Sequence, residues 1–511
     1  MTWDEEHDVV VVGAGGGGLT GAWAAARAGL DVLLVEATDR YGGTTAYSGG
    51  GMWFPGNAVL REAGAADDTA EARDYFHAVV GDRTPRALQD AFLAAGPRLV
   101  DELLTDEALV FEPFPWPDYY GAVPGAREVR QIRALALDPT ELGPLKDTVR
   151  PTLKVDRAGA PAPAELIGGQ ALVGRLLLAL SRLPQAQLRL RAACAELVVE
   201  DGRVVGILTE QPDGTRRIRA RRGVLIASGG FEQNAAMRAA YGVPGSVAGA
   251  MGPEGNLGRA IQAAIDVGAD TDLMDQAWWA PGLAHPDGTT SFSLWFTGGI
   301  FIDRDGRRFV NESLPYDRIG RAVIDRQRAG TVDATYWMVY DDREGLAPPV
   351  RSTTLPLAPH EEYVAAGLWH TADTLPELAE ALGVPGEELE STVRRFNVFA
   401  EAGHDDDHGR GDEPYDRAFS GGGSPLVPIT KGPFHAAAFG LSDLGTKGGL
   451  RTDEHARVLA TTGEVIPGLY AAGNSMAAVS GTTYPAGGNP IAASMVFSHL
   501  AVQHLTESEE R

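Results

Sequence analysis

The stretch Asp8–Glu36, DVVVVGAGGGGLTGAWAAARAGLDVLLVE, decides the fold of this 511-residue chain. Its four consecutive valines are too apolar for a half-exposed strand, so they predict a strand buried on both faces of a parallel sheet. Glycines follow at once, then an alanine-rich helix over residues 19–28 and a second apolar strand over residues 32–35. This order predicts an α/β protein with a Rossmann-like domain.

The glycines of this stretch predict a dinucleotide site. Gly13, Gly15 and Gly18 have the G-x-G-x-x-G spacing, in which they allow a tight turn, close approach of a pyrophosphate and close packing of the helix. The phosphates would lie at the helix N-terminus, and Glu36 would accept hydrogen bonds from an adenosine ribose. A glycine turn that serves only packing is the alternative, but the ordered strands, helix and acid favour the dinucleotide site.

Charge and cysteine content exclude several classes of function. The chain has 44 Lys and Arg against 69 Asp and Glu, a formal net charge of -25, which would repel a nucleic-acid backbone. Cys194 is the only cysteine, so an intrachain disulfide and a cysteine-based metal cluster are excluded. The stretch H-D-D-D-H at 404–408 is interpreted as a solvated loop, and we predict no metal site.

The sequence predicts a cytoplasmic enzyme and leaves open a loose attachment to a membrane surface. The N-terminus, MTWDEEHD, carries acids where a signal peptide needs a basic region and an apolar core. No run of about 18 apolar residues predicts a transmembrane segment.

Three later segments return the chain to the nucleotide. The first is a loop at residues 40–56, which offers hydroxyls and backbone amides to a flat ring system; the alternative is a flexible surface loop. Two further buried strands end on glycines. The last segment begins a helix, for which Asn489 is a suitable N-cap with Pro490 in the first helical position. The predicted cofactor-binding residues are Gly13, Ala14, Gly15, Gly17, Gly18, Glu36, Gly43, Thr44, Thr45, Ser48, Gly49, Gly229, Gly230, Gly473, Asn474, Asn489, Pro490 and Ile491.

The nucleotide domain is therefore expected to be discontinuous, with an inserted α+β catalytic or cap domain. We predict a first nucleotide-binding part at 1–276, a catalytic domain at 277–448 that is rich in aromatics, and a second nucleotide-binding part at 449–511. The proline-rich stretch 111–165 is expected to form a wall or lid of the active site, because long irregular stretches in compact proteins are often functional. It displays Tyr119.

The N-terminal fingerprint, the insertion and the returning strand G-L-Y-A-A-G together resemble the fumarate reductase flavoprotein superfamily. The resemblance implies FAD rather than NAD. Some members hold FAD through a histidine in the loop that matches residues 40–51. This chain has no histidine there, so noncovalent FAD is expected.

A more specific resemblance, to the 3-ketosteroid Δ1-dehydrogenases, covers essentially the full length. It rests on P-D-Y-Y at 117–120, N-E-S-L-P-Y-D at 311–317, S-D-L-G-T-K-G-G-L at 442–450 and S-G-T-T-Y-P-A-G-G-N-P at 480–490. Two arginines of the fumarate reductases are replaced, one by Tyr316 and one within Tyr484-Pro485-Ala486. The replacements indicate ketone rather than carboxylate chemistry.

The resemblance implies four catalytic residues. The Tyr484 hydroxyl and the backbone N–H of Gly488 would bind the C3 oxygen of a 3-ketosteroid, as oxyanion donors do. Tyr316 would take the C2 proton with help from Tyr119, and flavin N5 would take the C1 hydride. A phenol has a pKa of about 10, so Tyr316 would need that help at neutral pH. The expected role is in steroid degradation, with an external electron acceptor such as a quinone.

One departure and three alternatives remain open. Many relatives have glycine where this chain has Ala486, and Ala486 would be strained if that position needs a positive φ. A Δ4 dehydrogenase of 5α-3-ketosteroids would share the same site chemistry. A flavin electron carrier without substrate chemistry and a fumarate-reductase-like enzyme are less favoured, because the tyrosines are positioned and the arginines are absent.

Overall fold

The computed structural model describes residues 2–65, 67–420 and 423–507. The chain divides into two compact units. The first comprises residues 1–243, 252–277 and 445–511, and the second comprises residues 244–251 and 278–444. The first unit is thus assembled from three stretches of sequence. Whether the functional boundaries fall at 276 and 448 stays a prediction.

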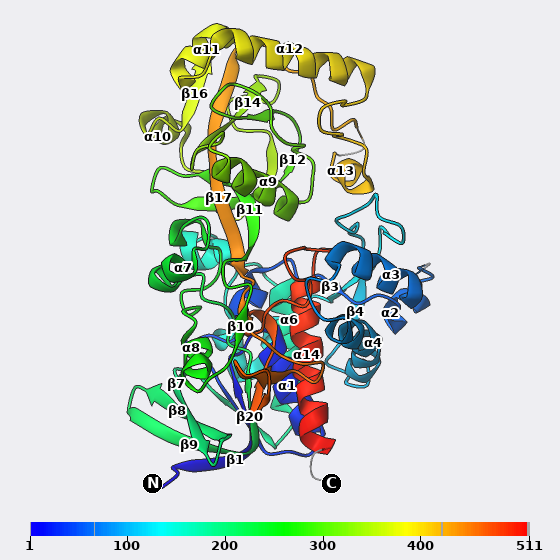
Figure 1. Ribbon diagram of the computed structural model, residues 1–511, viewed down its shortest axis with the longest axis vertical. Helices are drawn as coiled ribbons and strands as arrows, with labels where there is room; N and C mark the ends of the chain where they lie inside the picture. The colour runs from blue at the N-terminus through cyan, green and yellow to red at the C-terminus, as the bar shows by residue number, and fades with distance from the viewer. Residues whose placement is uncertain (1, 66, 421–422, 508–511) are drawn as a thin grey trace. The chain divides into compact units, whose positions relative to one another are not determined.

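The first unit is built on an eight-stranded sheet in the order β19-β20-β9-β1-β2-β6, with β8 also on β9 and β7 on β8. Strands β6, β2, β1, β9 and β20 are paired in parallel. Residues 9–12 of β1 lie at its centre and are at most 4% exposed. Apolar burial of a strand on both faces explains the uninterrupted valines. The prediction of a Rossmann-like α/β fold is confirmed (Figure 1).

Small residues let two helices of this unit approach each other closely. Helices α1 and α14 lie side by side (Figure 1), although more than 450 positions separate their first residues, Gly16 and Asn489. A Cβ on Gly17 would lie 2.2 Å from Ser494 Oγ of α14, and a Cβ on Gly21 would lie 2.7 Å from Leu225 Cδ2 of β9. The glycine-rich sequence of α1 is therefore a packing requirement as well as a nucleotide motif.

The elements of the first unit are as follows. They are β1 Glu5–Val12, α1 Gly16–Arg27, β2 Val32–Val35, η1 Gly43–Tyr47, β3 Met52–Trp53, α2 Ala58–Glu62, α3 Thr69–Val80, α4 Arg86–Leu103, β4 Phe111–Phe114, β5 Gln131–Ala134, η2 Pro139–Thr148, α5 Leu153–Ala158, α6 Gly169–Ser181, β6 Ala186–Arg189, β7 Ala193–Glu200, β8 Arg203–Gln211, β9 Gly214–Ile226, α7 Ala235–Tyr241, α8 Arg259–Asp266, β10 Thr271–Asp272, β18 Gly449–Leu450, β19 Arg457–Leu459, β20 Val465–Ala471, η4 Gly473–Ser475 and α14 Asn489–Glu507.

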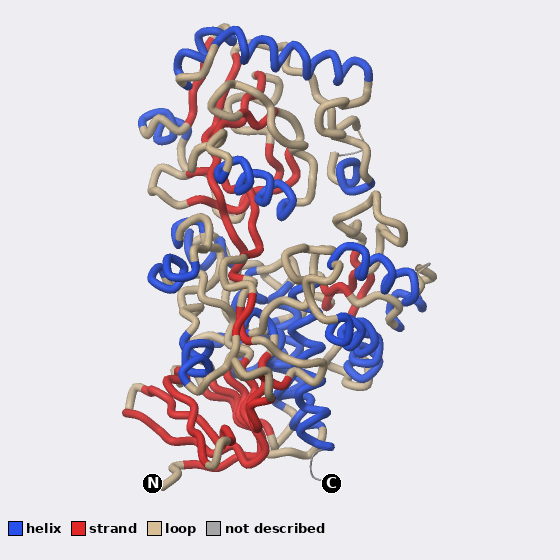
Figure 2. Tube along the Cα trace, in the orientation of Figure 1, coloured by secondary structure: helices blue, strands red, loops and turns tan. Residues whose placement is uncertain are grey.

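The second unit is built on a separate sheet in the order β13-β14-β17-β11-β12-β15, with β16 also paired to β17. Figure 2 shows its strands in red with helices at the far end from β11. Its elements are η3 Val247–Gly249, β11 Ala277–Ala284, β12 Thr290–Phe296, β13 Ile300–Ile302, α9 Tyr316–Arg328, β14 Tyr336–Asp341, β15 Val350–Thr353, α10 His360–Ala365, β16 Trp369–Ala372, α11 Leu375–Leu382, α12 Gly386–Ala402, α13 Pro414–Ala418 and β17 Phe434–Thr446.

An apolar core joins this sheet to α11 and α12. It includes Ile300, Val339, Leu378, Leu389 and Phe396, all at most 1% exposed. The helical spacing of the apolar positions in α12 brings Leu389, Val393 and Phe396 onto one face. None of the helices within residues 2–65, 67–420 and 423–507 is long and apolar enough to cross a membrane.

Candidate active site

The glycine turn of the first unit has the geometry that its spacing predicts. Gly13 has a φ of +101°, and a Cβ there would lie 2.4 Å from the Ala227 carbonyl oxygen. A Cβ on Gly18 would lie 1.8 Å from the Gly13 carbonyl oxygen. Side chains at either position are excluded by backbone atoms, so the turn and the start of α1 require glycine. Gly15 stands between them as the N-cap of α1.

The Glu36 carboxylate organises the backbone around this turn. It accepts hydrogen bonds from the backbone N–H of Ala14 at 3.0 Å and from the backbone N–H and hydroxyl of Thr38 at 2.9 and 2.8 Å. The Thr45 hydroxyl accepts from the Gly16 N–H at 3.0 Å and so ties the loop at η1 to the first turn of α1. Glu36 thus has a structural role beside the predicted ribose contact.

Many of the predicted cofactor residues share one property: they are partly exposed within otherwise buried segments. The fold leaves these predicted cofactor residues partly accessible: Gly15, Glu36, Gly43, Thr44, Thr45, Ser48, Gly229, Gly473, Asn474, Pro490 and Ile491. Gly13, Ala14, Gly17, Gly18, Gly230 and Asn489 are buried, and Gly49 is exposed. An elongated ligand with backbone-binding groups suits such a lining.

Two buried amide nitrogens of the first unit fit a ligand with hydrogen-bond acceptors. Gln131 Nε2 and Asn489 Nδ2 have no hydrogen-bond partner among the described residues, although the two side chains are 1% exposed. Buried polar atoms are normally satisfied, so each orphan donor calls for an acceptor. A flavin ring carries carbonyl oxygens and ring nitrogens, and the residues present fit FAD.

The structure corrects one detail of the helix start. Asn489 is already the first residue of α14, and the residue before it, Gly488, has a φ of +77°. The Ala492 N–H bonds to the Gly488 carbonyl oxygen at 3.0 Å, so Gly488 rather than Asn489 is in the capping position. The Asn489 amide is therefore available for contacts other than a cap.

Gly488 also cannot be replaced for steric reasons. A Cβ on it would lie 2.5 Å from the Gly51 carbonyl oxygen, which belongs to the chain backbone. Ala486 is fully buried but is not among the described residues with a positive φ, which are Arg191, Asp201, Leu273, Trp295 and Ala456. The concern that Ala486 would be strained is therefore unfounded, because its backbone is in a region that alanine adopts freely.

Tyr119 and Tyr484 lie together in the first unit. Their rings meet edge to face with centroids 5.1 Å apart, and both side chains are at most 5% exposed. The Tyr119 N–H and the Tyr75 hydroxyl both donate to the Pro485 carbonyl oxygen, at 2.8 and 2.5 Å. A Cβ on Gly487 would lie 2.9 Å from the Tyr119 hydroxyl, so that hydroxyl points at the Gly487-Gly488 backbone.

A buried ion pair holds the Tyr119 loop. The Asp118 carboxylate accepts from Arg130 at 2.7 Å, from the Trp53 indole at 2.9 Å and from the Arg127 N–H at 3.0 Å. Arg130 also bonds Asp67 at 2.8 Å, and all three charged side chains are at most 1% exposed. The predicted wall around Tyr119 is therefore held by buried polar contacts, and β4 and β5 pair within it.

Tyr316 belongs to the second unit, where it is the first residue of α9. It is 7% exposed, and the Phe292 ring of β12 meets it edge to face at 4.8 Å. The residues that line a pocket of this unit include Ser313, Leu314, Tyr316, Asp416 and Phe419. The N-terminal position on a helix fixes the backbone of Tyr316 and leaves its ring on the pocket wall.

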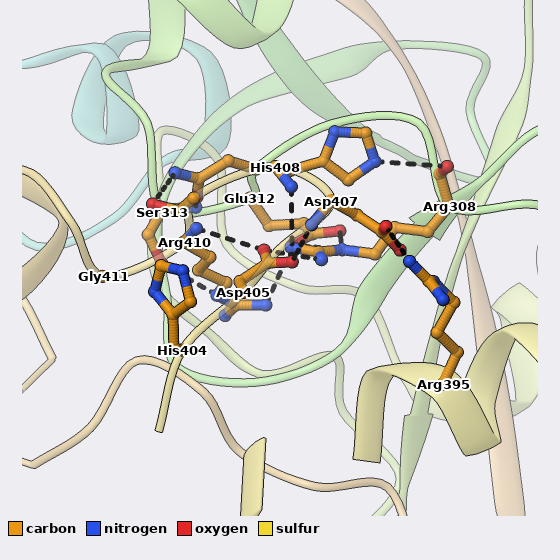
Figure 3. A network of polar contacts seen from close by, with 12 residues as sticks. Arg308, Glu312, Ser313, Arg395, His404, Asp405, Asp407, His408, Arg410 and Gly411 are labelled. Carbon is orange, nitrogen blue, oxygen red and sulfur yellow. Dashed lines mark hydrogen bonds and ion pairs between the residues drawn. The ribbon is translucent and has the colours of Figure 1, made fainter. Parts of the chain in front are cut away.

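Buried charges surround the loop that precedes Tyr316 (Figure 3). Arg308 bonds Glu312 at 2.8 Å and Asp405 at 2.7 Å, and Arg410 bonds Glu312 at 3.0 Å; these four residues are here called the charge cluster. Their side chains are at most 5% exposed. Burial opposes ionisation of Glu312, but the two guanidinium charges outweigh it and hold the pKa of Glu312 below its usual value.

The charge cluster corrects the interpretation of residues 404–408 as a solvated loop. Asp405 is 1% exposed and binds the Arg308 guanidinium and the Arg410 backbone N–H. His404 remains exposed, and Asp407 pairs with the exposed Arg395. The letters alone could not show this, because the Arg308 partner of Asp405 lies 97 positions earlier in the chain.

Sequence reasoning also missed Lys447. This lysine is fully buried, and its Nζ donates to the Thr483 carbonyl oxygen at 2.8 Å, next to Tyr484. Its position inside the apolar, glycine-rich run S-D-L-G-T-K-G-G-L could have indicated a buried lysine with a specific partner, because lysine is almost never fully buried without one.

Comparison with known proteins identifies the family. The FAD binding domain family matches residues 8–491. The 3-oxosteroid 1-dehydrogenase of Rhodococcus opacus is 37% identical over 99% of both chains, and the 4-oxocyclohexanecarboxylate 2-dehydrogenase of Sinomonas cyclohexanicum is 32% identical over 97% of this chain and 92% of that one. The chain belongs to this family of FAD-dependent oxidoreductases. The expected cofactor, FAD, and the resemblance stated from the motifs are confirmed.

A solved structure agrees over the whole length. The 3-ketosteroid Δ1-dehydrogenase of Sterolibacterium denitrificans, in complex with 1,4-androstadiene-3,17-dione, matches with a TM-score of 0.89 and 30% identity, over 99% of this chain and all of that one. The FAD-dependent dehydrogenase fold thus extends from the N-terminal strand to α14. The roles of individual site residues remain predictions.

Proposed function

We propose that this dehydrogenase desaturates the C1–C2 bond of 3-ketosteroids. The observation that carries the proposal is the Tyr119–Tyr484 pair, with ring centroids 5.1 Å apart beside the Gly487-Gly488 backbone. The pair lies where the resemblance expects a ketone-binding site, in a chain 37% identical to a 3-oxosteroid 1-dehydrogenase. Both observations favour a cyclic ketone over a dicarboxylate.

The residues of the chain divide the chemistry between them. Tyr484 and the Gly488 N–H bind the C3 oxygen and stabilise the negative charge that develops there. Tyr316 takes the C2 proton, and Tyr119 donates a hydrogen bond that lowers the cost of a phenolate. FAD, when bound, supplies the acceptor for the C1 hydride. Gln131 and Asn489 offer it amide donors, and the α1 N-terminus offers backbone N–H groups to its phosphates.

Three further features belong to the same proposal. FAD is bound noncovalently, because the loop at 40–51 has no histidine to carry it. An external electron acceptor such as a quinone would complete the redox cycle. The enzyme acts in the cytoplasm in steroid degradation, with at most loose attachment to a membrane surface.

The deciding experiment is anaerobic mixing of the flavin-loaded protein with 4-androstene-3,17-dione. We expect loss of flavin absorbance and a product two hydrogens lighter with a 1,4-dien-3-one ultraviolet spectrum. A 5α-saturated 3-ketosteroid tests the Δ4 alternative, and 4-oxocyclohexanecarboxylate and fumarate test the smaller substrates. The proposal would be contradicted if either of the other cyclic ketones reduced the flavin faster than 4-androstene-3,17-dione. It would also be contradicted if fumarate reoxidised the reduced flavin and no ketone reduced it. No response to any of these compounds would favour an electron carrier.

The catalytic tyrosines are tested by removing single hydroxyls. Tyr316→Phe should keep flavin and steroid binding but lower kcat by more than about a hundredfold, the usual contribution of a general base. Tyr484→Phe should lower kcat by a comparable factor through lost polarisation of the ketone. Tyr340→Phe is the matched control, since Tyr340 is buried in the second unit and its hydroxyl donates to the Leu346 carbonyl oxygen. A wild-type rate in Tyr316→Phe would remove Tyr316 as the base.

A further inference from the structure

Several contacts join the loop of Tyr316 to residues 405–416, and one of them is made by Asp416. Asn311, at the start of N-E-S-L-P-Y-D, donates from Nδ2 to Asp416 Oδ2 of α13 at 3.0 Å. We propose that Asp416 is a positioning residue: through Asn311 it fixes the loop that ends at Tyr316 and so places the phenol for proton abstraction. The inference rests on the proposed function of Tyr316.

Asn311 turns this contact into a constraint on the loop. Its Oδ1 accepts the Ser313 N–H at 2.8 Å, while its Nδ2 is held by Asp416. The same Asp416 oxygen accepts the Gly411 N–H at 2.9 Å. One carboxylate oxygen thus connects the backbone of residue 411, the Asn311 side chain and, through it, the backbone at 313.

The same elements form the pocket on which Tyr316 lies. Asp416 and Phe419 line it together with Tyr316. Phe419 stacks on Trp295 with centroids 5.0 Å apart, and Trp295 has a φ of +62° within β12. A non-glycine residue in this backbone region is held by its surroundings and is typical of functional sites. Movement of α13 would therefore disturb the Tyr316 side of the pocket directly.

The geometry indicates that the contact matters, not the charge. Both donors converge on Oδ2, while Oδ1 is buried and has no hydrogen-bond partner in the described part of the chain. Burial raises the pKa of Asp416, the bonds from Asn311 and Gly411 lower it, Glu413 raises it and Arg318 lowers it, with burial prevailing. An asparagine at 416 would present its single carbonyl oxygen to both donors.

The loop has a second, independent support, so removal of Asp416 should misplace it rather than unfold it. Arg410 donates from Nε to the Ser313 hydroxyl at 3.0 Å and from Nη1 to the Gly299 carbonyl oxygen at 2.8 Å. Glu312 accepts the Phe301 N–H at 3.0 Å. These contacts belong to the charge cluster and do not include Asp416.

The experiment compares Asp416→Ala, Asp416→Asn and Asn311→Ala in the flavin-loaded enzyme. With 4-androstene-3,17-dione, Asp416→Ala and Asn311→Ala should lower kcat by about tenfold, since a small misplacement of a reacting group is costly, and leave KM within about threefold. The deuterium isotope effect at C2 should rise. Asp416→Asn should stay within about threefold of the wild-type kcat.

Asp341→Ala is the matched control. Asp341 is also a buried carboxylate of the second unit, and one of its oxygens accepts two backbone N–H groups at 3.0 Å, but they belong to residues 430 and 431. It should lower thermal stability as Asp416→Ala does, with no change in the C2 isotope effect. A raised isotope effect in Asp341→Ala would show a general response to destabilisation and would overturn the inference.

Three further outcomes would also overturn it. A wild-type kcat in folded Asp416→Ala, or an equal loss in Asp416→Asn, would show that the contact does not place Tyr316. In the Tyr316→Phe background, Asp416→Ala should cause no further loss, and an additional tenfold loss would contradict the inference. If Tyr316→Phe alone is fully active, the proposed function of Tyr316 has failed instead, so the two failures are distinguishable. Should Asp416→Ala not fold, Asn311→Ala and Asp416→Asn decide the question.

Discussion

The turn that carries Tyr484 and the loop that carries Tyr316 are held by different means. Around Tyr484 the contacts are between backbone groups and small residues, with Gly488 against Gly51 and the Pro485 carbonyl oxygen accepting two bonds. Before Tyr316 the contacts are buried charges, with Arg308, Glu312, Asp405 and Arg410 all at most 5% exposed. The Tyr484 turn thus requires a residue without a side chain at 488, whereas the Tyr316 loop requires paired charged side chains.

The difference bears on tolerance to substitution. The Tyr484 turn should lose stability when a Cβ is added, because the Cβ would clash with backbone atoms. The Tyr316 loop should lose stability when one charged partner is removed, because another charge then stays buried without compensation. The four predictions below follow from this contrast and run from the largest expected effect to the smallest.

Removal of one cluster arginine should have the largest effect. Arg410→Met leaves Glu312 buried with one guanidinium instead of two, and we expect a loss of about 3–5 kcal/mol in the free energy of unfolding. Urea unfolding measures it. The matched control is Arg395→Met, whose paired Asp407 and guanidinium are both solvent-accessible, and it should leave the midpoint unchanged. Equal losses in the two variants would show that burial of the cluster has no special weight.

Addition of one methyl group should damage the Tyr484 turn. Gly488→Ala places a Cβ 2.5 Å from the Gly51 carbonyl oxygen at a φ of +77°, which should cost about 2–3 kcal/mol and release bound flavin. Thermal unfolding and the flavin-to-protein ratio measure the two effects. Gly386→Ala, where the new Cβ would lie 3.9 Å from Ala379 Cβ, is the control and should retain both stability and flavin.

The two regions should also respond differently to acid. In the first unit, burial lowers the pKa of His499 to about 4. As the pH falls below about 6.5, the imidazole is therefore protonated in the unfolded state before it is protonated in the folded state. The shift therefore leaves the free energy of unfolding unchanged above about pH 6.5 and should lower it by about 2 kcal/mol at pH 5. The pKa values of Glu312 and Asp405 are lowered, so their contributions are lost only below the ordinary carboxyl range.

Unfolding of His499→Gln between pH 7 and pH 5 checks the sign. The variant should lose less stability than the wild type over this range. His404, which is exposed, supplies the control variant His404→Gln, with a wild-type pH dependence expected. An unchanged slope in His499→Gln would place the acid response elsewhere.

The smallest effect is expected two residues before Gly488. Ala486 is not at a positive φ, so Ala486→Gly should only add chain entropy to the unfolded state and cost about 0.5–1 kcal/mol. Steroid turnover should stay within about threefold. A gain in stability instead would mean that the alanine backbone is strained after all.

Local patterns made the first region predictable from sequence. The valine run, the glycine spacing and the acid at 36 act within about 30 residues, and the structure has β1, the Gly13 turn and β2 where they were expected. The FAD family and the returning strand β20 followed from the same reasoning. Asn489 was misassigned by one position as a cap, because a positive φ at Gly488 is not visible in the letters.

Pairings across long separations were not predictable. Nothing near H-D-D-D-H indicates that Asp405 would meet Arg308, or that Lys447 would bond the carbonyl oxygen of Thr483. A charged residue in a glycine-rich stretch is usually solvated, and only tertiary structure supplies the partner that permits burial. The roles of Tyr119, Tyr316 and Tyr484 rest on the resemblance and stay predictions.

The position of β20 has a consequence for how the protein is made. This strand pairs with β9 inside the first sheet, yet it is translated after the whole second unit. During synthesis, residues 224–226 of β9 lack their partner on one edge until residue 465 and its neighbours emerge, and an unpaired strand edge can pair with other chains. Messages truncated before residue 465 should therefore yield aggregates rather than a soluble nucleotide domain.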